Sequence, residues 1–176
     1  MDLEARIARL EAESAIRQLI ARYTFTIDDR RRADVAALFA EDAEVCSADG
    51  VMNARGIDAI MAMYEGRFSA LGAGAHYMHD VALDFEGPDS ATGLVSGHAE
   101  VVRNGQMMVT SLRYHDRYVR TPAGWRFARR QINFLYYVPV QDYPGILLHL
   151  DRNRAYEAPK PADFPERLPG WTAQTG

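Results

Sequence analysis

A histidine and an aspartate, His76 and Asp28, are the residues of this sequence best suited to acid-base chemistry. The unperturbed pKa of histidine is about 6.5, so its imidazole can accept a proton near neutral pH. A neighbouring carboxylate improves this base, because it fixes the tautomer and stabilises the imidazolium ion. The two residues are far apart in the sequence, so only the fold can join them. The alternative is that Asp28 caps a helix and His76 is a packed polar side chain.

Two other side chains could help a leaving group to depart. Tyr23 precedes Asp28 by slightly more than one helical turn and could donate a proton or hold a substrate oxygen, unless it packs on the sheet. Arg130 shares the more apolar face of a predicted strand with Ile132. An inward arginine needs an anion, so Arg130 either stabilises a leaving anion or pairs with an inner acid such as Asp116.

Methionine and aromatic side chains are frequent enough to line a large apolar pocket. Such walls suit a flat aromatic or polycyclic molecule, although many of these side chains would equally form an ordinary core. We predict substrate contacts from residues of several predicted elements: Met61, Tyr64, Met78, Tyr114, Asp116, Phe134 and Tyr136.

Composition argues against several other kinds of site. The single cysteine, Cys46, excludes an intrachain disulfide and a cysteine zinc cluster, and the histidines lack metal-ligand spacing. The sequence has no glycine-rich phosphate loop, and its only lysine, Lys160, lies between two prolines. We therefore expect no metal and no cofactor. The net charge of −4, without a basic block, argues against a nucleic-acid partner.

The partner that composition favours is a hydrophobic small molecule. No apolar run approaches the ~20 residues that a helix needs to cross a bilayer, so we expect no membrane partner. The first ten residues are charged and periodic, unlike a signal peptide. We therefore expect a cytoplasmic protein.

The secondary-structure elements that must position these residues can be predicted from the spacing of apolar residues, which changes once along the chain. Apolar residues recur at helical spacing up to residue 71, which predicts helices over 14–27 and 57–71 with a break near Ser14. Alternation with a period of two follows, and Asn104-Gly105 is a strong hairpin signal. This order predicts an α+β fold with an antiparallel meander. The predicted strands cover 76–85, 91–103, 106–120 and 125–137.

The length of 176 residues favours one domain, which we place at residues 1–140. Residues 141–176 are predicted to form a C-terminal extension with a helix near 147–155 and a proline-rich tail. We expect this extension to act as a lid over the pocket or as a dimer contact.

Three stretches resemble the SnoaL-like family of the NTF2-like superfamily. The first runs from Ala15 through Tyr23 to Ala43, the second is Ala75-His76-Tyr77, and the third runs from Gly124 to Arg130. The resemblance spans roughly residues 10–140. It implies a cone-shaped fold in which helices pack on a strongly curved, mostly antiparallel sheet. It also implies a homo-oligomer, most simply a dimer through the outer sheet face.

Within this family the sequence is most similar to scytalone dehydratases and hexachlorocyclohexane dehydrochlorinases, which use an Asp-His pair inside the cone. Asp28 and His76 match that pair, and Arg130 matches an arginine that stabilises a leaving anion in the dehydrochlorinases. Tyr23 stands where the dehydrochlorinases have a lysine, and Val101 stands roughly where the dehydratases have a second histidine. The resemblance therefore implies that this chain uses the same Asp-His base, but it does not identify the leaving group.

Three classes of function fit these features. The first is a cofactor-independent lyase that removes water or formaldehyde from a hydrophobic, aromatic molecule. The second is an isomerase or polyketide-type cyclase with the same base. The third is a non-catalytic binding module, or a small subunit resembling the β subunit of ring-hydroxylating dioxygenases. A sealed cone would favour the third class, and an apolar pocket in which Asp28 touches His76 would favour the first two.

Overall fold

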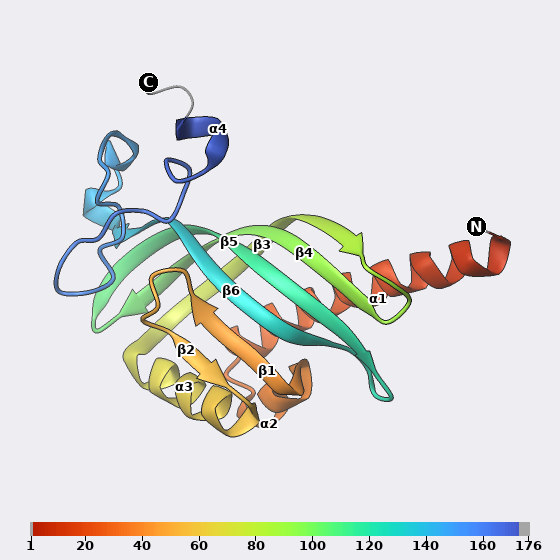
Figure 1. Ribbon diagram of the computed structural model, residues 1–176. Coiled ribbons are helices and arrows are strands. Elements are labelled where there is room, and N and C mark those ends of the chain that lie inside the picture. Colours follow the sequence, from red (N-terminus) through yellow and green to blue (C-terminus); the bar gives the residue numbers. More distant parts are fainter. Residues whose placement is uncertain (1, 173–176) are drawn as a thin grey trace.

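A long helix, α1 (Leu3–Asp28), begins the computed structural model, which describes residues 2–172. Asp2 caps this helix, since its Oδ1 accepts a hydrogen bond from the Ala5 N–H at 2.8 Å. The break expected near Ser14 is wrong, because the segment contains no glycine or proline and the helix continues through this residue. The N-terminal turns of α1 project beyond the sheet (Figure 1).

Short elements connect α1 to the long strands. They are α2 (Arg32–Val35), the 3-10 turn η1 (Ala36–Leu38), strands β1 (Phe39–Ser47) and β2 (Asn53–Arg55), and helix α3 (Ile57–Ala70). The four long strands that follow are β3 (Leu71–Phe85), β4 (Ser90–Arg103), β5 (Gln106–Thr121) and β6 (Gly124–Pro139). The sheet order is β2-β1-β6-β5-β4-β3, and every neighbouring pair is antiparallel except β1 with β6. The predicted α+β fold with its meander is therefore confirmed.

Strand β3 begins earlier than the sequence pattern predicted. The pattern placed its start at residue 76, whereas pairing with β4 already includes Gly74 opposite Val101. A Cβ atom at Gly74 would lie 2.8 Å from the Glu100 carbonyl oxygen, so a larger residue would push the two strands apart there. The glycine at this position therefore permits the close approach of the two strands.

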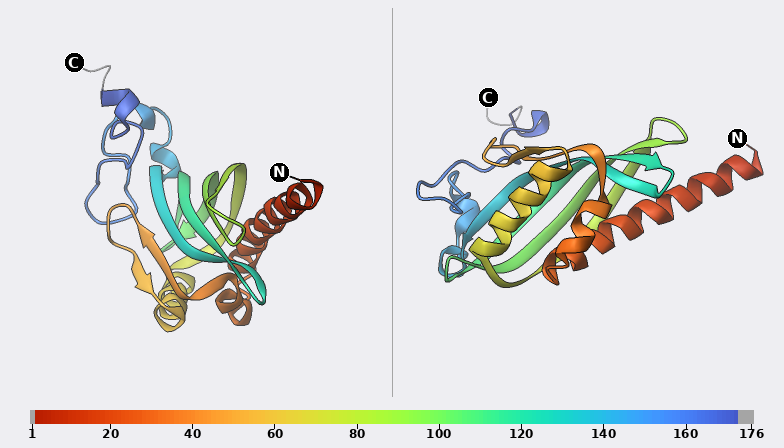
Figure 2. Two further views of the ribbon diagram at one scale, coloured as in Figure 1. Left: turned by 45° about the vertical axis from the view of Figure 1, so that its right-hand side comes forward. Right: turned by 90° about the horizontal axis from the view of Figure 1, so that it is seen from below.

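Helices α1 and α3 pack against one face of the sheet. In the right-hand view of Figure 2, from below, both helices lie in front of the strands. The residues that α1 buries recur every three or four positions, among them Ile16, Ile20, Tyr23 and Ile27. Register shifts between β3 and β4 and between β5 and β6 interrupt the ladders, and such irregularities bend a sheet. The bent sheet and its helices enclose the apolar core.

After β6 the chain has little regular structure. The remaining elements are two 3-10 turns, η2 (Val140–Asp142) and η3 (Ile146–Leu148), and the short helix α4 (Pro169–Thr172). The helix predicted over 147–155 is wrong, because the backbone around Asn153 is extended and pairs with both Tyr137 and Lys160. This pairing fastens the segment to the end of β6.

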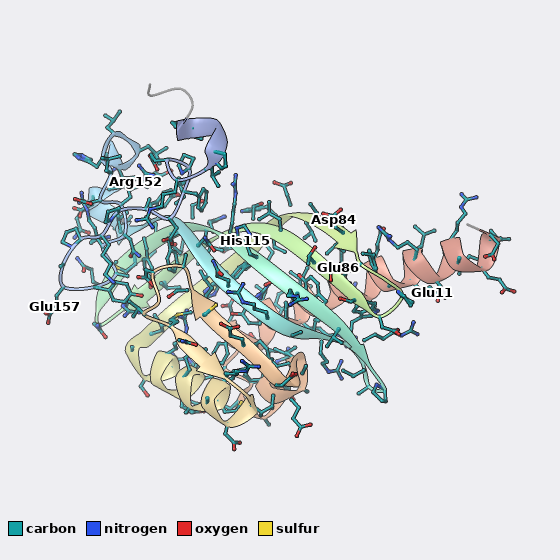
Figure 3. The ribbon with its side chains drawn as sticks, in the orientation of Figure 1. Glu11, Asp84, Glu86, His115, Arg152 and Glu157 are labelled. Carbon is teal, nitrogen blue, oxygen red and sulfur yellow. The ribbon has the colours of Figure 1, made fainter. Side chains whose placement is uncertain are left out.

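Arg152 also anchors this segment. Its side chain is 2% exposed and donates to both carboxylate oxygens of Glu166, at 2.7 and 2.8 Å. It further donates to the backbone oxygens of Leu135, His149 and Phe164. Figure 3 shows Arg152 within the C-terminal segment, near the end of β6. One of these hydrogen bonds joins the C-terminal segment to β6, and the rest join different parts of the segment to one another.

We expect Arg152→Ala to loosen the chain beyond Pro139. Subtilisin should cleave this variant there about tenfold faster than the wild type, since a loss of ~1.4 kcal/mol in local stability raises the open population tenfold. Arg154→Ala is the matched control, because Arg154 bonds Asp142 at 2.8 Å from a more exposed position. Equal cleavage of Arg152→Ala and Arg154→Ala would contradict the anchoring role.

The same ion pair gives a pH dependence. The hydrogen bonds from Arg152 lower the pKa of Glu166 below its ordinary value of 4.5. The ion pair of Arg152 and Glu166 therefore stabilises the folded segment fully at pH values above 4.5. This stabilisation is lost as the pH falls through the lowered pKa of Glu166.

Candidate active site

Asp28 and His76 lie in direct contact, although they come from different elements. Asp28 is the last residue of α1, and His76 lies in the first half of β3. Oδ1 of Asp28 is 2.6 Å from Nδ1 of His76, and Oδ2 accepts the His76 backbone N–H at 2.8 Å. Both side chains are mostly buried, with exposed fractions of 16% and 12%. The carboxylate is thus held by two bonds from one residue and fixes the orientation of the imidazole.

The second ring nitrogen of His76, Nε2, has no hydrogen-bond partner among the described residues. When Nδ1–H donates to the carboxylate, Nε2 carries the lone pair, and this is the tautomer that a general base requires. The arrangement can therefore accept a proton from a molecule beside His76.

Two small cavities adjoin His76. One, of about 30 Å³, lies toward Asp28 and Phe68, and the other, of about 20 Å³, lies toward Tyr114 and Phe134. Each has room for about one water molecule, far less than the 300–1,000 Å³ of most ligand pockets. The walls of both cavities include Arg67, Leu71, His76 and Val101. A displacement of the shared side chains would join the two spaces.

The predicted substrate contacts occupy different positions. Tyr114 and Phe134 line the smaller cavity with His76. Met61 and Met78 are partly buried and pack against the core, outside both cavity walls. Tyr136 lies on the outer sheet face, in a groove of about 590 Å³ that also includes Tyr143. Burial and the Tyr143 hydroxyl raise the pKa of Tyr136 to about 12.

Arg130 and Asp116 form a buried ion pair behind Tyr114. Nε and Nη2 of Arg130 donate to the Asp116 carboxylate at 3.0 and 2.8 Å, and neither side chain is exposed. The guanidinium carbon lies 4.0 to 4.2 Å from the ring centroids of Tyr114, Tyr23 and Phe127. Burial opposes the charge on Arg130, but the carboxylate and the tyrosines hold its pKa above the ordinary value. Arg130 lines neither cavity.

Tyr23 also lies behind the cavity wall. It is 4% exposed, and its hydroxyl accepts a hydrogen bond from the Tyr64 hydroxyl at 3.0 Å. Burial, together with Tyr23, raises the pKa of Tyr64 well above its ordinary value. The ring of Tyr23 packs edge-on against Tyr114, at 6.3 Å between centroids. Tyr23 and Tyr64 therefore support the residues that face His76.

Arg67 is a cavity residue that sequence reasoning missed. It lies in the last turn of α3 and lines both cavities beside His76. The signal was present, because Arg67 follows the buried Ile60 and Tyr64 by seven and three positions and so shares their helix face. A charged residue on a buried helix face is unusual, and this position alone makes Arg67 a candidate site residue.

Residues 2–172 lack two further features, a metal site and a membrane-spanning helix. No group of three or more histidine, cysteine, aspartate or glutamate side chains has an arrangement that could hold a metal ion. No helix in this part of the chain is long and apolar enough to span a membrane.

Comparison with known proteins places these features in context. Residues 8–131 match the SnoaL-like domain family. An uncharacterised protein of Mycobacterium tuberculosis is 28% identical over 129 residues, which cover 70% of this chain and 86% of that protein.

Two solved structures are similar in fold at low sequence identity. A putative scytalone dehydratase from Novosphingobium aromaticivorans has a TM-score of 0.74 at 21% identity, covering 93% of this chain and 99% of its own. A hexachlorocyclohexane dehydrochlorinase, LinA-type3, from Novosphingobium barchaimii has a TM-score of 0.70 at 20% identity, covering 78% of this chain and 95% of its own.

Proposed function

The chain belongs to the SnoaL-like family, and from that premise we propose that it is a cofactor-independent lyase acting on a hydrophobic, aromatic small molecule. The observation that best supports this proposal is the 2.6 Å contact between Asp28 and His76, because His76 belongs to the walls of two largely apolar cavities. Nε2 of His76 removes a proton from the substrate, and the Asp28 carboxylate stabilises the imidazolium that forms. Removal of a C–H proton expels a neighbouring hydroxyl group, which leaves as water when a donor protonates it. Removal of the O–H proton of a CH₂OH group instead breaks the adjacent C–C bond and releases formaldehyde, and the carbon that keeps the electron pair takes up a proton.

Tyr114 is the proton donor in this proposal. It lines the same cavity as His76. Burial, together with the neighbouring Tyr23 hydroxyl, raises the pKa of Tyr114 far above its ordinary value, so its phenol stays protonated. A protonated phenol can donate to the oxygen of a leaving group. Tyr23 and Arg130 act through Tyr114, since both pack against its ring.

One observation favours a second candidate. Cavities of about 20 and 30 Å³ are too small for an aromatic molecule without movement of the wall. A closed cone of this kind suits a non-catalytic binding module or the small subunit of a larger enzyme. The two candidates differ in whether purified protein alone converts a substrate.

The test is a screen of the purified protein, without added cofactor, against aromatic alcohols, aromatic diols and polyketide-like ketones. We expect a product lighter than its substrate by water or formaldehyde in mass spectrometry. A product of unchanged mass would replace the lyase by an isomerase or cyclase. Binding without conversion, together with a native mass that reveals a large partner subunit, would favour the second candidate. The native mass also tests our proposal that the protein alone is a homo-oligomer.

A further inference from the structure

Within residues 2–172, Arg67 forms no ion pair with a carboxylate, although Asp28 lies on the wall of one of its two cavities and is itself bonded to His76. The nearest polar contact of Nη1 is Sδ of Met52 at 2.9 Å. A thioether sulfur is a weak acceptor. The more deeply buried arginines differ, since Arg130 binds Asp116 and Arg152 binds Glu166. Arg67 thus has donor capacity that the protein itself leaves unused.

Four tyrosines contribute to the surroundings of Arg67, and Asp28 and Arg30 share the wall of one of its cavities. The tyrosines that interact electrostatically with its guanidinium are Tyr23, Tyr64, Tyr137 and Tyr114. Burial raises the pKa values of Tyr64 and Tyr114, so these phenols remain uncharged at neutral pH. A partly buried guanidinium without a counter-ion is unfavourable, and an anion entering the cavity would remove this penalty.

The position of Arg67 links this charge to the base. Arg67 and His76 both belong to the walls of the two cavities. A molecule that fills the joined space would contact the imidazole and the guanidinium together. A charged oxygen of a bound molecule could replace the Met52 sulfur as the hydrogen-bond acceptor of Arg67. The new bond would be stronger, because charge-assisted hydrogen bonds are roughly twice as strong as neutral ones.

We propose that Arg67 determines specificity by binding an anionic oxygen, a carboxylate or a phenolate, of the aromatic molecule from which His76 removes a proton. This inference rests on the proposed function for the role of His76. The binding of the anion itself depends only on Arg67 and the cavity. The substrate class is therefore aromatic acids and acidic phenols.

Calorimetric titration with 2-naphthoate and its neutral isostere 2-naphthamide tests this inference. The wild type should bind the carboxylate about tenfold more tightly than the amide, the effect of one charge-assisted contact. Arg67→Gln and the apolar Arg67→Met should abolish this preference, and Arg67→Lys should retain part of it. Arg32→Gln is the matched control, because the exposed Arg32 contacts α3 through Glu65 at 2.9 Å. This control should keep the full preference.

Two results would overturn the assignment of Arg67. One is a wild type that binds the two probes equally or binds neither. The other is a folded Arg67→Gln or Arg67→Met variant that keeps the preference for the carboxylate. A phenolate is distinguished from a carboxylate by titrating 2-naphthol below and above its pKa, since only its ionised form should show the preference.

His76→Asn separates this inference from the proposed function. It should lose turnover and keep the preference for 2-naphthoate. If it keeps turnover as well, the role of His76 is wrong and that of Arg67 stands. If the wild type lacks the preference for 2-naphthoate while His76→Asn abolishes turnover, the role of Arg67 is wrong and that of His76 stands.

Discussion

Asp28→Asn is expected to lower kcat/KM by about 10²-fold or more, the usual contribution of a general base. The asparagine removes the negative charge that stabilises the imidazolium. It also turns an NH₂ group toward Nδ1 while its carbonyl accepts the His76 backbone N–H, as Oδ2 of Asp28 does at 2.8 Å. That arrangement places the ring proton on Nε2, so the imidazole can no longer accept a proton from the substrate.

The neighbouring Asp29 supplies a matched control for this variant. Asp29 follows α1, its side chain is 62% exposed, and its nearest charged partner is Arg31 at 3.8 Å. Asp29→Asn should therefore leave kcat/KM close to the wild-type value. Equal activities for Asp28→Asn and Asp29→Asn, measured on the substrate found in the screen, would contradict the role of Asp28.

Asp116→Ala should have the largest effect on stability. It leaves the fully buried Arg130 without its carboxylate and removes the acceptor of the Tyr118 hydroxyl, which bonds Asp116 at 2.8 Å. Breaking a buried pair in this way lowers the free energy of unfolding by about 3–5 kcal/mol. Urea denaturation followed by circular dichroism measures the change.

Glu86→Gln is the control for Asp116→Ala. Glu86 lies at the turn after β3 (Figure 3), and its contact with Arg117 at 3.9 Å is exposed on both sides. Loss of such a surface pair changes the free energy of unfolding by no more than about 1 kcal/mol. A similar loss in both variants would show that the buried pair is not important for stability.

A double variant decides between the two roles left open for Arg130. Replacing the pair by Asp116→Leu and Arg130→Met should recover most of the lost stability, because an apolar pair needs no compensation. Turnover retained by this variant would assign Arg130 a structural role. Turnover lost from a stable variant would show that Arg130 contributes to the reaction, through its contact with Tyr114 or by stabilising a leaving anion.

The fold could be predicted from the sequence because its signals are local. The change from helical to alternating spacing and the Asn104-Gly105 hairpin depend on neighbouring residues, and the meander they predicted is present. The membership of the SnoaL-like family is confirmed as well. The error over 147–155 arose where tertiary contacts overrode local preference, since the extended backbone of Asn153 pairs with Tyr137 and Lys160. The break expected near Ser14 has no such cause, because that segment contains no glycine or proline.

The candidate site could be predicted only in part. The contact between Asp28 and His76 followed from the family resemblance, since nothing in the spacing of these residues brings them together. Arg67 could not be identified in this way, because its importance depends on the lack of an ion pair with any carboxylate of the described residues. The size of the cavities depends on side-chain packing, which sequence patterns do not determine.

The comparison of His76→Ala with His79→Ala tests the central claim most directly. Both residues lie in β3, but His79 is exposed and its Nε2 lies 2.7 Å from Nδ1 of His98, away from both cavities beside His76. With the substrate found in the screen, we predict that His76→Ala loses at least ~10²-fold in turnover and that His79→Ala keeps wild-type turnover. Wild-type turnover by a folded His76→Ala variant would contradict the assignment of His76 as the base.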